Sequence, residues 1–312
     1  MAPLVSVVVA NYRQSQFLPQ AIDSAMGQGV DVELIVLDDA SGDGSRGVIE
    51  RLAREHEAIK PIFNEQNLGI SRTHNLGLDA AQGDFIAFLP ADDYWYPGKL
   101  ASQLRLLEEE SRLVGAYADS DVVDVDGKPT GQSWSTLHPA PPGVDEANLA
   151  SRLLHGMFVS GNTGLYRRSV AGDLRFDERL SFYNDWLFWI MLALRGPVRG
   201  ELQARAAYRT SASTFRRPPL IQAEDQVRLL EILSPLESRF DASDFDRLVA
   251  GAVLGLTMKG ESVRAFQQLV RARPAVRRKL LNSRFFLRWL VSWMRVRENT
   301  LLSCWNANAA PR

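Results

Sequence analysis

The sequence predicts an α/β fold with a doubly wound, mostly parallel sheet flanked by helices, followed by a helical C-terminal extension. Three observations lead to this prediction. Short apolar runs rich in β-branched residues are separated by about 20 residues, helical patterns lie between them, and the pattern is helical almost throughout after residue 217. The runs are residues 4–9, 33–37, 59–63 and 84–89. Because crossovers of this length give parallel, right-handed connections, we expect ligands at the carboxyl ends of the strands.

The elements follow in order along the chain. We expect Ser15 to cap a first helix whose apolar residues repeat every three or four positions. Residues 114–117 and 122–125 are predicted strands that lead to the hairpin turn Asp126-Gly127. The proline-rich residues 132–143 are predicted to form an irregular loop over the site or a lid. A strand at 163–166, a helix at 185–195 and a strand at 204–209 are expected next.

A change of pattern near residue 113 and the double proline Pro218-Pro219 set the expected boundaries. We predict one domain over residues 1–217, with a first half of about 1–112 and a second half of about 113–217. We predict that residues 218–312 form a helical, basic C-terminal region.

Composition excludes several classes of protein. With 312 residues, 46% of them hydrophobic, the chain is long enough to bury a core, so a disordered or disulfide-stapled protein is excluded. A net charge of −1 argues against nucleic-acid binding. Cys304 is the only cysteine, and no basic leader precedes the first apolar run, so we expect a cytoplasmic protein. No run approaches the roughly 18 apolar residues that span a bilayer.

Two pairs of acidic residues follow predicted strands. Asp38-Asp39 come directly after the second run, where a carboxylate can accept a hydrogen bond from the N–H of a nucleotide base or from a ribose hydroxyl. Asp92-Asp93 follow the fourth run, where two carboxylates suit Mg²⁺ or Mn²⁺ bridging to a diphosphate. The alternative for the second pair is a helix cap, with a helix beginning near Pro97.

Five motifs in a fixed order resemble family 2 of the inverting glycosyltransferases, which have the GT-A fold. They are the Val-Val-Val-Ala-Asn-Tyr stretch ending at Tyr12, the Val-Leu-Asp-Asp-Ala-Ser-Gly-Asp-Gly-Ser stretch at 36–45, Asn67-Leu68-Gly69 with Asn75-Leu76-Gly77, Ala81-Gln82-Gly83-Asp84, and Ala91-Asp92-Asp93. The resemblance covers about residues 4–215 and implies a nucleotide-binding half (1–112) and an acceptor half (113–217).

The resemblance assigns a role to each candidate site residue. It implies that Asp39 faces the base and that Tyr12 offers an aromatic wall, and that Asp92 is the metal ligand. The nucleotide-binding set is Ala10, Tyr12, Asp38, Asp39, Asn67, Gly69 and His74. The diphosphate and metal set is Asp92, Asp93 and Arg209, and the acceptor set is Gly161, Asn162, Asn184 and Trp186.

The general base implied by the resemblance is Asp185, in the segment Asn184-Asp185-Trp186-Leu187. Displacement with inversion needs one carboxylate to take the proton of the acceptor hydroxyl as it attacks. An alternative is that Asp185 caps the following helix, and both roles are compatible. At a helix N-terminus the ionised carboxylate is stabilised, which lowers its basicity.

Departures from the family pattern bear on the cofactor. Pro90 replaces the first acid of the Asp-x-Asp motif, so the divalent cation, Mg²⁺ or Mn²⁺, is left with Asp92 and Asp93. His74 replaces the usual Arg, and Asn184 the usual Glu before the base. These departures favour an alternative in which the chain is a degenerate, noncatalytic member that binds a nucleotide or a partner.

The C-terminal region is basic and aromatic. Residues 260–298 contain ten basic and two acidic residues, interleaved with aromatic and apolar ones. This composition is typical of an interfacial membrane helix, and the alternatives are that residues 260–303 pack on the domain or form a homodimer.

The expected activity is transfer of a sugar from a nucleoside diphosphate donor to a saccharide or lipid-linked saccharide acceptor, in bacterial-type surface polysaccharide assembly. A UDP or dTDP donor is favoured, because a pyrimidine imide presents an N–H to Asp39. The location is expected to be cytoplasmic, with peripheral attachment to the inner face of the membrane left open.

Overall fold

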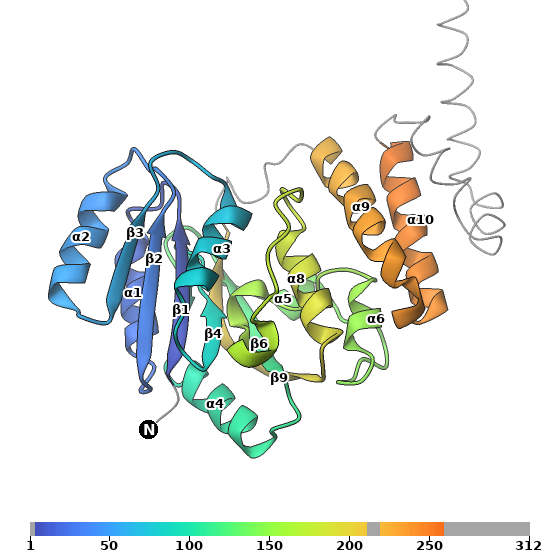
Figure 1. Ribbon diagram of the computed structural model, residues 1–312, viewed down its shortest axis with the longest axis horizontal. Coiled ribbons are helices and arrows are strands. Elements are labelled where there is room, and N and C mark those ends of the chain that lie inside the picture. The colour runs from blue at the N-terminus through green and yellow to red at the C-terminus, as the bar shows by residue number, and fades with distance from the viewer. Residues whose placement is uncertain (1–3, 211–218, 259–312) are drawn as a thin grey trace, which may run out of the picture. The chain divides into compact units, whose positions relative to one another are not determined.

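The computed structural model describes residues 4–210 and 219–258 (Figure 1). The chain divides into two compact units, residues 1–216 and 217–312. The first unit is built on one nine-stranded sheet. Its strands are β1 (Val5–Asn11), β2 (Val32–Asp38), β3 (Ile59–Phe63), β4 (Phe85–Phe88), β5 (Tyr94–Trp95), β6 (Gly115–Val123), β7 (Pro129–Ser133), β8 (Leu165–Arg167) and β9 (Val198–Arg209).

Helices connect these strands. In the first unit they are α1 (Leu18–Met26), α2 (Ser45–Glu55), α3 (Ile70–Ala80), α4 (Lys99–Glu109), α5 (Trp134–Leu137), α6 (Leu149–Leu153), the 3₁₀ helix η1 (Gly161–Thr163), α7 (Arg168–Ala171) and α8 (Asn184–Ala193). In the second unit they are α9 (Pro219–Leu233), the 3₁₀ helix η2 (Ser234–Arg239) and α10 (Ala242–Met258).

The strand order is β3-β2-β1-β4-β8-β6-β9-β5, with β7 paired to β6. Strands β3, β2, β1 and β4 are parallel, as predicted from the spacing of the apolar runs. Strand β8 is antiparallel to both β4 and β6, so β6 runs in the same direction as β4, and β9 is parallel to β6. The carboxyl ends of β1, β2, β4, β6 and β9 therefore lie at one edge of the sheet, where a doubly wound fold binds its ligands.

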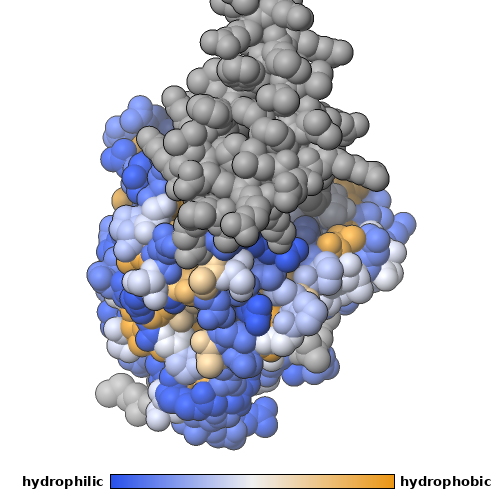
Figure 2. All heavy atoms as spheres, turned by 90° about the vertical axis from the view of Figure 1, so that its right-hand side faces the viewer, coloured by the Kyte–Doolittle hydropathy of each residue, from blue (hydrophilic) through white to orange (hydrophobic). Residues whose placement is uncertain are grey.

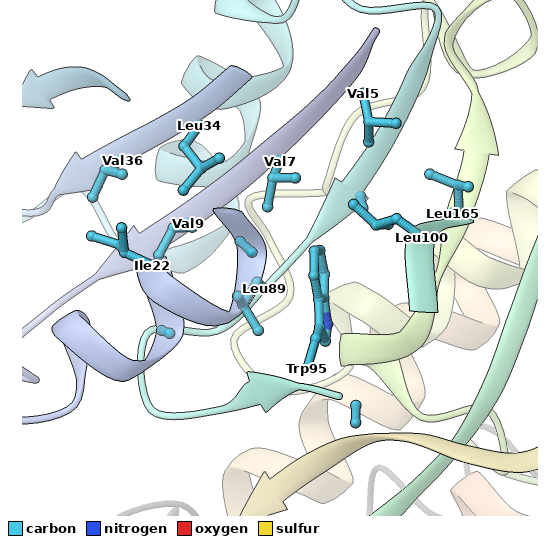
Figure 3. Packing of buried hydrophobic residues seen from close by; sticks show 14 of the residues in the cluster. Val5, Val7, Val9, Ile22, Leu34, Val36, Leu89, Trp95, Leu100 and Leu165 are labelled. Atoms are coloured by element: carbon cyan, nitrogen blue, oxygen red, sulfur yellow. The ribbon is translucent and has the colours of Figure 1, made fainter. Parts of the chain in front are cut away.

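Successive side chains of a strand point to opposite faces of the sheet, and both faces of β1 are covered by helices. Val5, Val7 and Val9 point to one face, where they are buried with Ile22 of α1 and Ile49 of α2 (Figure 3). The opposite face of β1 carries Val8, and α3 approaches it so closely that a Cβ on Gly77 would lie 2.4 Å from Val8 Cγ1. Glycine at this position lets α3 pack directly on the sheet. Helices thus cover both faces and leave the carboxyl edge open.

Several boundaries differ from the sequence prediction. The two strands predicted at 114–117 and 122–125 merge into one strand, β6, which ends at Val123 and pairs with β7 across a turn where Gly127 has φ 81°. The predicted hairpin at this turn is confirmed. Helix α1 begins after Phe17 with no side-chain cap, so the predicted cap by Ser15 was wrong. Residues 132–143 contain a short helix, α5, with a capping box between Ser133 and Thr136.

In the second unit, α9 and α10 pack against each other. Among residues 4–210 and 219–258, no helix is long and apolar enough to cross a membrane. The described surface visible in Figure 2 is mainly hydrophilic, with hydrophobic residues scattered over it. The basic segment 260–303 lies outside the described residues.

Candidate active site

The first corner of the site joins the carboxyl ends of β1 and β2. Asn11 Nδ2 donates to Asp38 Oδ1 at 2.7 Å, and Asp38 Oδ2 accepts from the backbone N–H of Ser41 at 3.1 Å. Both Asn11 and Asp38 are almost completely buried. Asp38 therefore ties the turn after β2 to β1, and its carboxylate is used inside the protein rather than offered to a nucleotide as predicted.

Asp39 holds the loop that precedes α3. Its Oδ1 accepts from Asn64 Nδ2 and from the backbone N–H of Leu68, both at 2.8 Å, and its Oδ2 accepts from the backbone N–H of Gly69 at 2.9 Å. Asn67 Nδ2 donates to the Asp39 carbonyl at 3.3 Å. The structure thus gives Asp39 a positioning role that the sequence did not reveal, and three donors already occupy the carboxylate predicted to face the base.

The residues beside this corner are exposed and strained. Tyr12 is 43% exposed directly after β1, with the Arg13 guanidinium 5.0 Å from its ring centroid, while Ala10 is buried at the end of the strand. Arg13 and Ala40 both have φ 58°, a left-handed conformation that costs a non-glycine residue about 1–3 kcal/mol. Such strain concentrates at functional sites, and here it shapes the two turns at the open edge of the sheet.

The second corner carries the buried acidic pair after β4. Asp93 is 3% exposed, its Oδ1 accepts from the backbone N–H of Arg209 at 2.8 Å, and its Oδ2 accepts from Asn162 Nδ2 at 2.8 Å. Burial first, and then the neighbouring Asp92 charge, raise the pKa of Asp93 well above its usual range. Burial also raises the pKa of Asp92, which is more open than Asp93 and accepts no side-chain hydrogen bond from another described residue.

Asn162 is the hub behind this corner and not an acceptor contact, which corrects the prediction. It is 3% exposed, and besides Asp93 its Nδ2 lies 3.3 Å from the Ala207 carbonyl. Its Oδ1 accepts from the hydroxyls of Ser120 and Ser160, both at 2.8 Å. Asn162 orients the Asp93 carboxylate through its hydrogen bond to Oδ2. Because every polar group of the amide is already bonded, Asn162 presents no group to a substrate.

Arg209 also differs from the prediction. It is 3% exposed, and its guanidinium donates to the Asp92 carbonyl at 2.7 Å, the Val125 carbonyl at 2.7 Å and Gln20 Oε1 at 2.6 Å. The cation also lies 4.6 Å from the Phe17 ring centroid. Arg209 therefore clamps the acidic corner to α1 and to the β6–β7 hairpin, and its donors are engaged rather than free to grip a phosphate.

Asp185 stands in the first turn of α8. Its Oδ1 accepts from the backbone N–H of Trp186 at 2.7 Å, but the N-cap residue is Tyr183, so Asp185 is not the cap. Its Oδ2 lies 3.2 Å from the position that a Cβ on Gly161 would take. The side chain is open to solvent, yet crowding by protein atoms raises its pKa to about 6, above the value expected at a helix N-terminus.

Three other predicted site residues do not offer the contact expected of them. Trp186 and Asn184 are bonded inside the protein, and His74 is uncharged. Trp186 is 4% exposed and its indole N–H donates to the Leu153 carbonyl at 2.6 Å, so its ring cannot stack on an acceptor. Asn184 is 7% exposed and donates to Ser71 Oγ at 3.0 Å. His74 lies between aromatic rings, and burial lowers its pKa to about 4, so it does not replace the charge of an arginine.

Short chains of contacts bring the corners together. Gly69, which donates to Asp39, opens α3, and two residues later Ser71 accepts from Asn184, the neighbour of Asp185. Gly161, which faces Asp185, adjoins Asn162, which holds Asp93. Burial first, and then the charges of the site carboxylates, raise the pKa of Tyr208 on β9. The contributing charges come from Asp93, Asp92 and Asp185. Carboxylates from distant segments therefore surround one region.

The oxygen donors at the second corner suit a hard divalent cation. Asp92 keeps a carboxylate not bound by another described residue, and its pKa is raised by burial, which an adjacent cation would offset. The described residues hold no cluster of three or more acidic, histidine or cysteine ligands. The donor set fits an ion held by few protein ligands and completed by a diphosphate, as is usual for Mg²⁺.

Sequence reasoning missed an aromatic group beside the acids. The rings of Trp134 of α5 and of its C-cap residue His138 lie 4.1 Å apart between centroids, and the Trp134 ring lies 5.1 Å from the Tyr208 ring. Two signals were present in residues 133–138: the spacing of four between the two rings, which matches one helical turn, and the Ser133-to-Thr136 capping box.

A separate groove of about 1190 Å³ lies away from this cleft. Its lining includes Glu146, Arg112, which precedes β6, and residues 195–201, which lead into β9. Because β6 and β9 run in the same direction as β4, this groove lies at the amino ends of the strands. It contains none of the predicted site residues, and its arginines are paired with Glu110, Glu146 and Asp173.

Comparisons with known proteins agree with this fold. The family model described as Glycosyl transferase family 2 matches residues 6–175, more than half of the chain. The chain is 37% identical over 131 residues to an uncharacterized glycosyltransferase of Nostoc, covering 41% of this chain and 40% of that protein. It is 32% identical over 128 residues to TuaG of Bacillus subtilis, a protein named for teichuronic acid biosynthesis, covering 41% of this chain and 50% of that protein.

Thus the chain spans half or less of the length of these two relatives. Among solved structures, TarS of S. aureus in complex with UDP-GlcNAc superposes with a TM-score of 0.70 and 20% identity, covering 96% of this chain and 92% of that one. A mannosyltransferase of Pyrobaculum calidifontis in complex with GDP-Man and Mn²⁺ gives 0.58 and 15%, covering 98% and 88%. At this identity the likeness shows a shared fold.

Proposed function

Because the chain belongs to glycosyl transferase family 2 and has the GT-A fold, we propose that it moves a sugar from a UDP- or dTDP-linked donor to a hydroxyl of a saccharide acceptor, with inversion. The observation that carries the proposal is Asp185. It keeps one carboxylate oxygen directed towards Gly161, beside the hub that holds the acidic pair after β4. This supports Asp185 as the proton acceptor beside the expected position of the diphosphate.

The proposed reaction uses these residues as follows. The acceptor hydroxyl oxygen forms a bond to the anomeric carbon, the bond from that carbon to the diphosphate oxygen breaks, and Asp185 takes the hydroxyl proton. With a pKa of about 6, Asp185 is mostly ionised at neutral pH and more basic than an ordinary aspartate. Attack and departure on opposite sides of the carbon invert its configuration.

Asp92 and, behind it, Asp93 would hold a Mg²⁺ or Mn²⁺ ion together with the diphosphate. When bound, such an ion supplies positive charge that stabilises the departing diphosphate. The chain's own contribution is to fix the carboxylates through Asn162 and Arg209. The Mn²⁺ in the mannosyltransferase complex supports this assignment by fold likeness.

We propose that the nucleoside binds at the carboxyl ends of β1 and β2. Tyr12 offers an exposed ring there, and Asp39 uses three donors and keeps capacity for a fourth, which a pyrimidine imide N–H would fill. The TarS complex with UDP-GlcNAc supports a UDP donor. The relative named for teichuronic acid biosynthesis supports a role in surface polysaccharide assembly on a saccharide or lipid-linked acceptor.

Calorimetric titration of UDP, dTDP and GDP in the presence of Mn²⁺ tests the proposal, followed by measurement of UDP release from a panel of UDP-sugars. We expect the pyrimidine nucleotides to bind more tightly than GDP and at least one UDP-sugar to turn over. Absence of binding by all three nucleotides would contradict the proposal. Binding without turnover, in an extract that supplies acceptors, would instead favour the noncatalytic alternative, which the replacement of the first motif acid by Pro90 suggests.

A further inference from the structure

A group of three aromatic side chains lies beside the carboxylates and has no role in the chemistry described above. Trp134 opens α5 and His138 is its C-cap residue, with the two rings 4.1 Å apart and inclined by 32°. The Tyr208 ring of β9 meets Trp134 edge-on at 5.1 Å and 70°. We call these three residues the aromatic platform.

Hydrogen bonds hold the platform against the strand that supports the acidic pair. Asp119 of β6 accepts from the backbone N–H of Ser135 at 3.0 Å, which fixes α5. The next residue, Ser120, donates to Asn162, the hub behind Asp93. Because both ties start from adjacent residues of β6, the platform and the acidic corner are held by the same strand.

The strand order places the platform on the acceptor side of the cleft. The proposed nucleoside corner belongs to β1 and β2, and Asp92 follows β4. Strands β8, β6 and β9 lie beyond β4, on the side opposite β1. Tyr208 is on β9, so a donor that extends from β2 to the acidic corner leaves the region beyond it, next to the platform, for the acceptor.

The chemistry of the platform suits a sugar ring. Aromatic faces bury the C–H face of a flat, partly apolar ring, and indole and imidazole nitrogens bind hydroxyls. The Trp134 indole N–H is buried and has no hydrogen-bond partner among residues 4–210 and 219–258. Burial lowers the pKa of His138, so at neutral pH the imidazole is uncharged and offers both a donor and an acceptor.

We propose that the aromatic platform binds a pyranose ring of the acceptor and presents its hydroxyl to Asp185. This inference rests on the proposed function and names the substrate class of the same site: a neutral acceptor sugar recognised by stacking on Trp134. His138 packs against the indole, and Tyr208 lies between Trp134 and the acids.

Saturation-transfer-difference NMR tests the platform with the full chain in the presence of UDP and Mn²⁺. The probes are methyl β-D-glucopyranoside, methyl β-D-galactopyranoside, methyl α-D-mannopyranoside and methyl N-acetyl-β-D-glucosaminide. We expect at least one to receive saturation at its ring C–H protons and Trp134→Ala to weaken its binding about fivefold to tenfold. Leu137→Ala is the matched control, because Leu137 lies on the same helix and is 41% exposed.

Two further measurements separate the possible failures. Trp134→Phe keeps a ring and should retain most of the stacking, and circular dichroism and UDP affinity identify a variant that has lost its fold. If UDP binds the wild type but no pyranoside does, or if Trp134→Ala binds the pyranoside as wild type does, the platform is overturned while the proposed function stands. If UDP itself does not bind, the proposed function fails first.

Discussion

Replacing Asp185 by Asn tests the proposed base through its titration. Crowding by neighbouring protein atoms raises the pKa of Asp185 to about 6, although the side chain is open to solvent. The ionised fraction is therefore about 0.9 at pH 7 and about 0.1 at pH 5, and kcat/KM in the wild type should fall roughly tenfold between these values. The amide of Asn keeps the shape and the bond from the Trp186 N–H but accepts no proton, so transfer should fall by about 10²–10⁴.

The assay is the initial rate of UDP release with acceptor present, measured from pH 5 to pH 8, with UDP affinity determined by calorimetry over the same range. Glu178→Gln is the control, because Glu178 is an exposed acid a few residues before α8. We expect the Asp185→Asn profile to be flat and its UDP affinity to stay within a few-fold of wild type. A wild-type profile without an inflection near pH 6, or a variant within tenfold of wild-type activity, would refute the assignment.

The same shift has a consequence for stability. A folded-state pKa raised above the unfolded value of 3.8 means that folding disfavours the ionised form of Asp185. The stability that the protonated form contributes is fully present below pH 3.8 and is lost as the pH rises through about 6. Asp185→Asn should therefore melt above wild type at pH 7, with the difference shrinking towards pH 4. Because the side chain is open to solvent, the effect is smaller than the shift alone implies.

Three further predictions follow from single contacts. Gly161→Ala should lower kcat, because the added Cβ would lie 3.2 Å from the proposed base; Gly47→Ala in α2, whose Cβ meets nothing within 4 Å, is the control in the same transfer assay. Asn162→Ala should lower the free energy of unfolding by about 1–3 kcal/mol, because it leaves Oδ2 of buried Asp93 without its donor; an unchanged urea midpoint would argue against this. Asp92→Asn should abolish any gain in UDP affinity from Mn²⁺, measured by calorimetry with and without the ion. A gain that persists in the variant would mean that the cation binds to other residues.

The fold was largely predictable because the period of apolar residues is a local signal. The third run was predicted and found at Ile59–Phe63, and the parallel order of the first four strands followed from the spacing between runs. The failures occurred where tertiary contacts decide. Strand β6 continues through Asp119 and Asp121, whose polarity suggested a break, because both carboxylates find hydroxyl partners.

The candidate site was predictable as a region but not as a set of contacts. The order of the motifs singled out Asp92 and Asp185. A motif does not reveal, however, which polar atoms of a side chain are already bonded to other residues of the protein. Asn162 and Trp186 carry groups that suit a sugar, and the structure instead satisfies those groups internally. The pKa of Asp185 was expected to be low from its helix position, and crowding by distant segments reverses that shift.

The hydrogen bonding of each carboxylate shows which acids remain open where Pro90 replaces the first acid of the Asp-x-Asp motif. Within the described residues, Asp38, Asp39 and Asp93 each accept hydrogen bonds from protein donors on both oxygens. Among residues 4–210 and 219–258, Asp92 accepts no side-chain hydrogen bond, and only one oxygen of Asp185 accepts a hydrogen bond. The acids bonded on both oxygens hold the turns at the open sheet edge, where strain at Arg13 and Ala40 must be offset. The two open acids are therefore those to which the proposed reaction gives the diphosphate-bound cation and the proton.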